Sequence, residues 1–350
     1  MNGCRGVWRS VSSPTVPLFT SVPPGDEAAG SGPAAAVSLP EKIVAGWRDA
    51  GFAPVSVNTA VELGRRPDLR QRLDSLSLPV IVVDRSGTRA GAASDDRDPR
   101  CTMSEFLLAM HRQVPTGIVA IVNSDIGWAG AWTAQSVTDV VDAGGAPLGQ
   151  RMDVPAFPPG GGVPTGVMDV HGADFVAFPA EAIPSLLGLV PAVLRFGMPW
   201  WDHYLPLALL MLGVGPRLVP PGTLWHVTHP QRWHMRTWGD VGLVAARQFA
   251  AAVRALPPNP ASRTWMRLFD GRFAPAAAVD PVDRLVRLLI EASLCPGTLL
   301  RSRLGVLAGG NIALLLQAAA AIAAAGGGGG PPATVREDDG GEAGGSGPRW

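Results

Sequence analysis

The sequence predicts an α/β protein built on a mainly parallel, doubly wound sheet. Short apolar runs alternate with amphipathic segments through the first half of the chain, which is the pattern of strand–helix–strand units. The runs LPVIVVD at 78–84 and TGIVAIV at 116–122 are continuous, and such runs are typical of strands buried on both faces. Hydrophobic residues make up 47% of the 350 residues, enough for a sizeable core.

The first half of the chain divides into four strands and three helices. We expect the strands at 16–22, 54–58, 78–84 and 116–122, and the helices at 39–50, 59–76 and 102–113. In the first helix Ile43, Val44 and Trp47 share one face. Thr102 and Glu105 form a capping box at the start of the third.

The second half of the chain is less regular. Its expected strands are at 145–153, 168–178 and 218–227, and its expected helices are at 205–212 and 241–255. We expect an extension at 1–14, one domain over 15–240, a helical region at 241–325 and a disordered glycine-rich tail at 326–350. The alanine-rich segment 304–325 is long enough to span a membrane. It contains Gly309, Gly310, Asn311 and Gln317, which favours a packed helix or a poorly ordered tail.

Charge and cysteine content exclude several classes of protein. The 29 basic and 29 acidic residues cancel, so no broad basic surface for nucleic acid is expected. Cys4, Cys101 and Cys295 are odd in number and far apart, which indicates free thiols in a reducing compartment. Residues 1–24 lack the apolar core of a signal peptide. We therefore expect a cytoplasmic protein with no nucleic-acid partner and no membrane association.

The main candidate site is Asn123-Ser124-Asp125, directly after the strand 116–122. In open α/β sheets ligands bind beyond the carboxyl ends of the strands. Asn123 and Asp125 can project to one side there and hold a hard divalent ion, which would neutralise a substrate diphosphate. The alternative is an Asx turn that leaves the strand. Spacing alone does not separate the two.

Three further candidates for chemistry lie in the second half. Asp202 follows Trp200 and Trp201 at the start of a helix, where it is either a helix cap or a general base between aromatic surfaces. His226 and His229 form HxxH, and on a strand their rings point to opposite faces, so at most one is expected to bind a metal. Ordinary hydrogen-bonded histidines are the more common explanation.

Asn58 and Asp84 end the second and third strands and are candidates for substrate binding. Asp84 could accept hydrogen bonds from a base or ribose, or it could cap a helix. The chain has no Walker A motif, no dinucleotide-type GxGxxG and no GxSxG elbow.

Several segments occur in an order that resembles a bacterial family of GT-A-type glycosyltransferase-like proteins. They are AGF at 50–52, VSVN at 55–58, VNSDI at 122–126, HGADFVAF at 171–178, GMPWWDHYLPLALLMLGV at 197–214 and LWHVTHPQRW at 224–233. The resemblance covers about residues 16–238. It implies a GT-A-like fold: a Rossmann-like, mainly parallel sheet with helices on both faces, extended by a mixed sheet on the acceptor side.

The resemblance also implies a role for each candidate. The DxD metal-binding position falls on Asn123-Ser124-Asp125, the acceptor-activating position on Asp202, and the later metal or diphosphate ligand on His226 or His229. The first aspartate of DxD is here Asn123, which leaves room for a metal-independent or inactive member.

We therefore expect an inverting glycosyltransferase that uses a nucleotide-diphosphate sugar and an unknown sugar, lipid or protein acceptor. Asp125, assisted by Asn123, would bind Mg²⁺ or Mn²⁺, Asp202 would act as base, and Trp200 or Trp201 would stack on a sugar. These residues and one histidine should meet in one cleft, with one tryptophan buried and the other beside it. The alternatives are a non-catalytic glycan- or nucleotide-binding module and, last, a nucleotidyltransferase.

Overall fold

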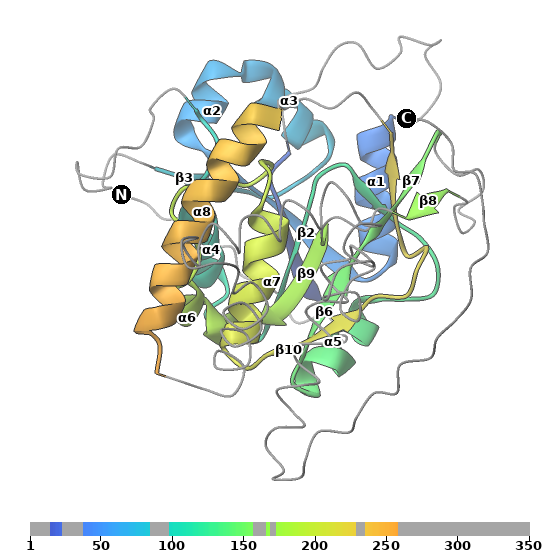
Figure 1. Ribbon diagram of the computed structural model, residues 1–350. Helices are drawn as coiled ribbons and strands as arrows, with labels where there is room; N and C mark the ends of the chain where they lie inside the picture. The colour runs from blue at the N-terminus through green and yellow to red at the C-terminus, as the bar shows by residue number, and fades with distance from the viewer. Residues whose placement is uncertain are drawn as a thin grey trace, which may run out of the picture.

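The structure is a computed structural model that describes residues 15–22, 38–84, 98–156, 166–168, 173–228 and 235–257. Its centre is a seven-stranded sheet in the order β10-β6-β9-β4-β1-β2-β3 (Figure 1). The strands are β1 (Val16–Thr20), β2 (Phe52–Thr59), β3 (Val80–Val83), β4 (Ile118–Val122), β6 (Gly145–Gly149), β9 (Phe175–Pro179) and β10 (Gly215–Leu218). All run parallel except β9, which is antiparallel to β4 and β6.

Helices cover both faces of this sheet. One face carries α1 (Leu39–Asp49), α2 (Ala60–Arg65), α3 (Pro67–Ser75) and α5 (Ala134–Asp142). The other carries α4 (Met103–Gln113), η3 (Ala180–Ala182), α6 (Ile183–Leu186), α7 (Trp201–Met211) and α8 (Met235–Ala255). Side chains alternate between the two faces of a strand, so the sheet has one hydrophobic core on each face. Leu18 of β1 packs into the core on the α1 side and Phe19 into the core on the α4 side. The prediction of a mainly parallel α/β fold is confirmed.

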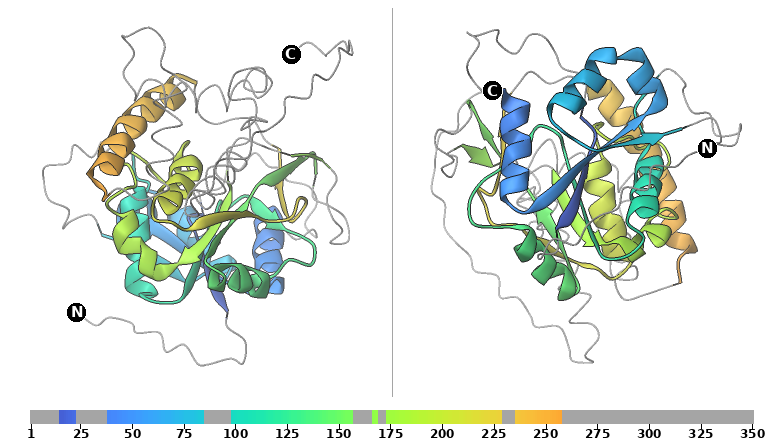
Figure 2. Two further views of the ribbon diagram at one scale, coloured as in Figure 1. Left: turned by 60° about the horizontal axis from the view of Figure 1, so that its bottom comes forward. Right: turned by 180° about the vertical axis from the view of Figure 1, so that it is seen from behind.

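A second, four-stranded sheet lies at the carboxyl edge of the first. Its order is β5-β11-β7-β8, with β5 (Ile126–Trp128), β11 (Leu224–Val227), β7 (Arg151–Val154) and β8 (Val167–Met168). It is mixed, since β11 pairs parallel with β7 and antiparallel with β5. It lies beside α1 (Figure 2), where Trp47 Nε1 donates to the Ile126 carbonyl at 2.9 Å.

Most of the first half follows the sequence prediction. The strands at 16–22, 54–58 and 116–122 and the helices at 39–50 and 102–113 appear within a few residues of their expected bounds. The capping box of α4 is present: the Thr102 N–H donates to Glu105 Oε2 at 2.8 Å, and the Glu105 N–H donates to Thr102 Oγ1 at 3.1 Å. The helical stretch 59–76 is two helices, α2 and α3.

Four predictions about strands were wrong, among them the one for 168–178, which covers residues of β8 in one sheet and of β9 in the other. The run 78–84 is not buried on both faces, because β3 is the edge strand and Val82 is 46% exposed. The range 145–153 holds two strands, β6 and β7, which belong to different sheets. The same is true of 218–227, where β10 and β11 are separated by a turn.

Some predictions concern residues outside the described ranges. They include His229, Cys4, Cys295, the segment 304–325 and both terminal extensions. Cys101 is buried and forms no disulfide. Within the described ranges, no helix is both long enough and apolar enough to cross a membrane.

Candidate functional site

The order of strands reverses beside β1. From β1 the chain builds outward through β2 to β3, and it then returns to place β4 on the other side of β1. In open α/β sheets the crevice at the carboxyl ends of the strands at such a point is where ligands bind. Asn123 is the first residue after β4, so the loop 123–125 lies at this point on the carboxyl edge of the sheet.

The antiparallel strand β9 brings a buried carboxylate to the same edge. Phe175, its first residue, pairs with Val122, the last residue of β4. Asp174 therefore faces Asn123. The Asn123 N–H donates to the Asp174 carbonyl at 3.1 Å, and Asn123 Nδ2 donates to Asp174 Oδ1 at 2.8 Å.

The start of β7 supplies an arginine to this carboxylate. Strand β6 ends opposite the start of β9, with Gly149 paired to Phe175, and the chain then enters the second sheet. Arg151 Nη1 donates to Asp174 Oδ1 at 3.1 Å and Oδ2 at 3.2 Å. Its Nε donates to Asp153 Oδ1 at 3.0 Å, because residues two apart on a strand share a face.

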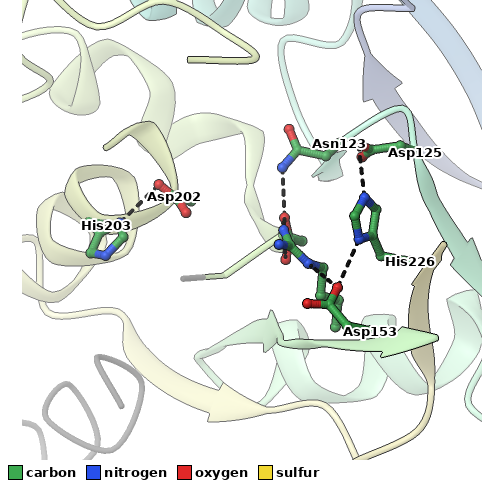
Figure 3. Close-up of polar contacts among 8 residues, drawn as sticks. Asn123, Asp125, Asp153, Asp202, His203 and His226 are labelled. Atoms are coloured by element: carbon green, nitrogen blue, oxygen red, sulfur yellow. Dashed lines mark hydrogen bonds and ion pairs between the residues drawn. The ribbon is translucent and has the colours of Figure 1, made fainter. Parts of the chain in front are cut away.

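His226 of β11 completes the group. The register of the second sheet pairs it with Asp153 on one side and with Ile126 on the other. Its Nδ1 lies 2.8 Å from Asp153 Oδ1, and its Nε2 lies 3.4 Å from Asp125 Oδ2 (Figure 3). These contacts link six residues in a row, and the loop 123–125 joins the two ends; we call them the polar ring: Asn123, Asp174, Arg151, Asp153, His226 and Asp125.

The polar ring holds His226 as a cation. Both ring nitrogens face carboxylate oxygens, and each must carry a proton to donate. Burial alone would lower the pKa of His226, but the hydrogen bonds to Asp125 and Asp153 raise this pKa to about 9. Burial would raise the pKa of Asp153, yet its bonds to His226 and Arg151 outweigh burial and lower it.

The residues present fit a divalent ion only in part. Asp125 is 47% exposed at its side chain, and Mg²⁺ commonly takes one or two carboxylates and completes its shell with water and substrate phosphates. Among the described residues, no three His, Cys, Asp or Glu side chains are grouped to hold a metal. A cationic His226 has no lone pair to offer, so it does not fit as a ligand in this arrangement.

Asp202 belongs to the first turn of α7 and lies apart from the polar ring (Figure 3). Its described hydrogen-bond partner is the adjacent His203, whose Nδ1 lies 2.9 Å from Asp202 Oδ1. It does not cap the helix, since the N-cap residue is Trp200. Helix α7 is followed, after a short turn, by the parallel strand β10, so the helix runs antiparallel to this strand. The first residues of α7 therefore lie toward the carboxyl edge of the sheet.

The expectation that one of the two tryptophans borders a cleft was wrong. Trp200 and Trp201 are 1% and 2% exposed. Trp200 has φ 88°, a left-handed conformation that breaks the regular alternation on which the expectation rested. Both indoles enter one core, Trp201 against Phe196 and Trp200 against α8, where a Cβ at Gly242 would lie 2.6 Å from Trp200 Cε2. Neither indole is placed to stack on a sugar.

Asn58 is buried and its side chain is bonded within the protein. It accepts from Ser56 Oγ at 2.7 Å and donates to Glu62 Oε2 at 2.9 Å and to Ser21 Oγ at 3.3 Å. It therefore fixes the end of β1 rather than presenting its amide to a ligand. Asp84 follows the edge strand β3, and β1 and β2 separate that strand from β4.

Sequence reasoning missed Arg151, Asp153 and Asp174. Arg151 and Asp153 lie in the range 145–153, which was expected to be a single strand. Asp174 lies in the segment 171–178, which contributed only to the resemblance. One signal could have found the first two: opposite charges two residues apart on an expected strand share a face. Of the predicted residues, the structure brings Asn123, Asp125 and His226 together.

No protein-family model matches the chain, and no curated protein matches it.

Proposed function

We propose that the protein is a glycosyltransferase that transfers a sugar from a nucleotide-diphosphate sugar. The observation that carries the proposal is the half-exposed carboxylate of Asp125, which is held by His226 at the carboxyl edge of the sheet where the strand order reverses. The second, mixed sheet at this edge supports the proposal further, because an acceptor would need a surface separate from the donor site.

The carboxylate of Asp125 and the side-chain amide oxygen of Asn123 are the groups that would hold Mg²⁺ or Mn²⁺. Such an ion would neutralise charge on the leaving diphosphate. In this assignment His226 is a positioning residue, because it fixes one oxygen of Asp125 and is itself fixed by Asp153.

Asp202 is the proposed general base for the acceptor hydroxyl. Its side chain is 22% exposed, and His203 holds one of its oxygens. A base separate from the donor site suits inverting chemistry. Base catalysis of this kind contributes roughly 10²–10⁴-fold, so Asp202→Asn is expected to lower transfer by that factor while donor binding stays unchanged.

A second candidate is a non-catalytic module that binds a nucleotide or glycan. The observation that favours it is the amide of Asn123, which donates to Asp174 where the resembled family carries a carboxylate.

One experiment separates the two. Titration calorimetry with UDP-, GDP- and ADP-sugars, with and without Mn²⁺, measures binding, and slow release of free sugar measures hydrolysis. We expect Mn²⁺-dependent binding and hydrolysis that Asp125→Ala removes and the surface control Asp68→Ala leaves intact. Absence of binding to the wild type would overturn the proposal, and binding without hydrolysis would favour the module.

A further inference from the structure

We propose that Arg151, Asp153 and Asp174 are positioning residues that fix the loop 123–125 from the second sheet. They act through Asn123 and His226 and touch no substrate. The inference relies on the proposed function only for what the loop binds.

Two separate connections reach the loop, one at each end. Asn123 is held by the backbone and side chain of Asp174, at 3.1 and 2.8 Å. Asp125 is held by His226, which is in turn held by Asp153 at 2.8 Å. The two ends of the loop are therefore fixed by residues of β11 and of the segment before β9, far away in sequence.

Arg151 joins the two connections. Its Nη1 contacts both oxygens of Asp174, and its Nε contacts Asp153, so one guanidinium sets the distance between the two carboxylates. A lysine ammonium is a compact point charge on a flexible stem and does not reproduce this fork. We therefore expect Arg151→Lys to loosen both ends of the loop although it keeps the charge.

The loop needs such support because Asp125 is exposed. An exposed carboxylate samples several rotamers. Binding a ligand restricts it to one of them, which costs conformational entropy. The buried imidazole ring of His226, itself held by the partly exposed Asp153, removes that freedom in advance. Residues that orient ligating carboxylates typically contribute a 10–100-fold difference in affinity.

The test compares wild type, Arg151→Lys and Asp153→Asn, a variant that preserves shape. Arg48→Lys is the matched control. Arg48 also bridges two acceptors, the Leu76 and Ser77 carbonyls at 2.9 and 2.8 Å, but it does so at the opposite edge of the sheet. Hydrogen exchange by mass spectrometry reports on peptides that cover 122–128. Calorimetry measures the affinity for Mn²⁺ together with UDP, GDP or ADP.

We expect faster exchange in 122–128 and roughly 10–100-fold weaker binding for both ring variants, with exchange in β1 and β2 unchanged. Arg48→Lys should leave the loop and the affinity as in the wild type. Unchanged loop exchange in both ring variants would overturn the inference, as would faster exchange with unchanged affinity. If the wild type binds none of the three nucleotides, the proposed function fails, and loop exchange alone decides: faster exchange supports the positioning role and unchanged exchange overturns it.

Discussion

At the scale of single residues, the pair Trp200-Trp201 shows how one backbone angle changes the role of a motif. The positive φ of Trp200 sends both indoles into the core, where they pack on helix α8 and on Phe196. Replacing either by alanine removes a large buried side chain, so each change should cost about 3–5 kcal/mol of unfolding free energy. Chemical denaturation of the two variants tests this, with the partly exposed Trp132→Ala as the control of smaller effect. A loss confined to one of the pair would contradict the shared burial.

Glu62 gives a prediction about pH. Burial raises the pKa of its carboxyl group despite the hydrogen bond from Asn58. An acid whose pKa is higher in the folded state binds its proton more tightly there. The protonated carboxyl of Glu62 therefore stabilises the folded state fully below pH 4.5, its ordinary pKa, and this stabilisation is lost as the pH rises through the folded-state pKa. Glu62→Gln should therefore stabilise the protein at pH 7 and lose this advantage near pH 4. Urea unfolding at the two pH values measures the difference, and a gain that is equal at both would refute the assignment.

At the scale of elements, the second sheet depends on a glycine. Gly127 of β5 pairs with Trp225 of β11, and a Cβ there would overlap the Trp225 indole. Gly127→Ala should push the two strands apart and carry His226 away from Asp125, at a cost of roughly 1–3 kcal/mol. Gly64→Ala is the matched control, since Gly64 lies in α2 with open space around it and should be neutral or slightly stabilising. Thermal unfolding compares the two, and equal effects would mean that the close approach is unimportant.

Elements with strong local patterns were predictable. Helix α4 has its capping box and apolar stripe within the short segment 102–113, and β4 is a continuous apolar run. Local pattern does not say where in the sheet a strand lies, so β3 was expected to be buried on both faces and lies at the edge. It also does not say where a strand passes from one sheet to another, which is why β6 and β7 were taken as one.

At the scale of the whole molecule, the same limit explains what was predictable of the site. Asn123 and Asp125 follow a buried strand, and that position alone marked them. Arg151, Asp153 and Asp174 become neighbours of the loop only through the register of β9 with β4 and of β11 with β7. That register is set by pairing across long stretches of chain, and no short motif in the sequence records it.

The place of β9 also has a consequence for the order in which the molecule folds. This strand lies between β4 and β6, yet it is made after both. Strands β1, β2 and β4 can pair with one another early, whereas β6 has no neighbour on that side until residues 175–179 arrive and close a long loop. Refolding followed by pulsed hydrogen exchange should show protection of β1, β2 and β4 before β6. During synthesis, the free edge of β4 stays open to other chains until β9 has left the ribosome, so that interval is when the protein is most exposed to aggregation.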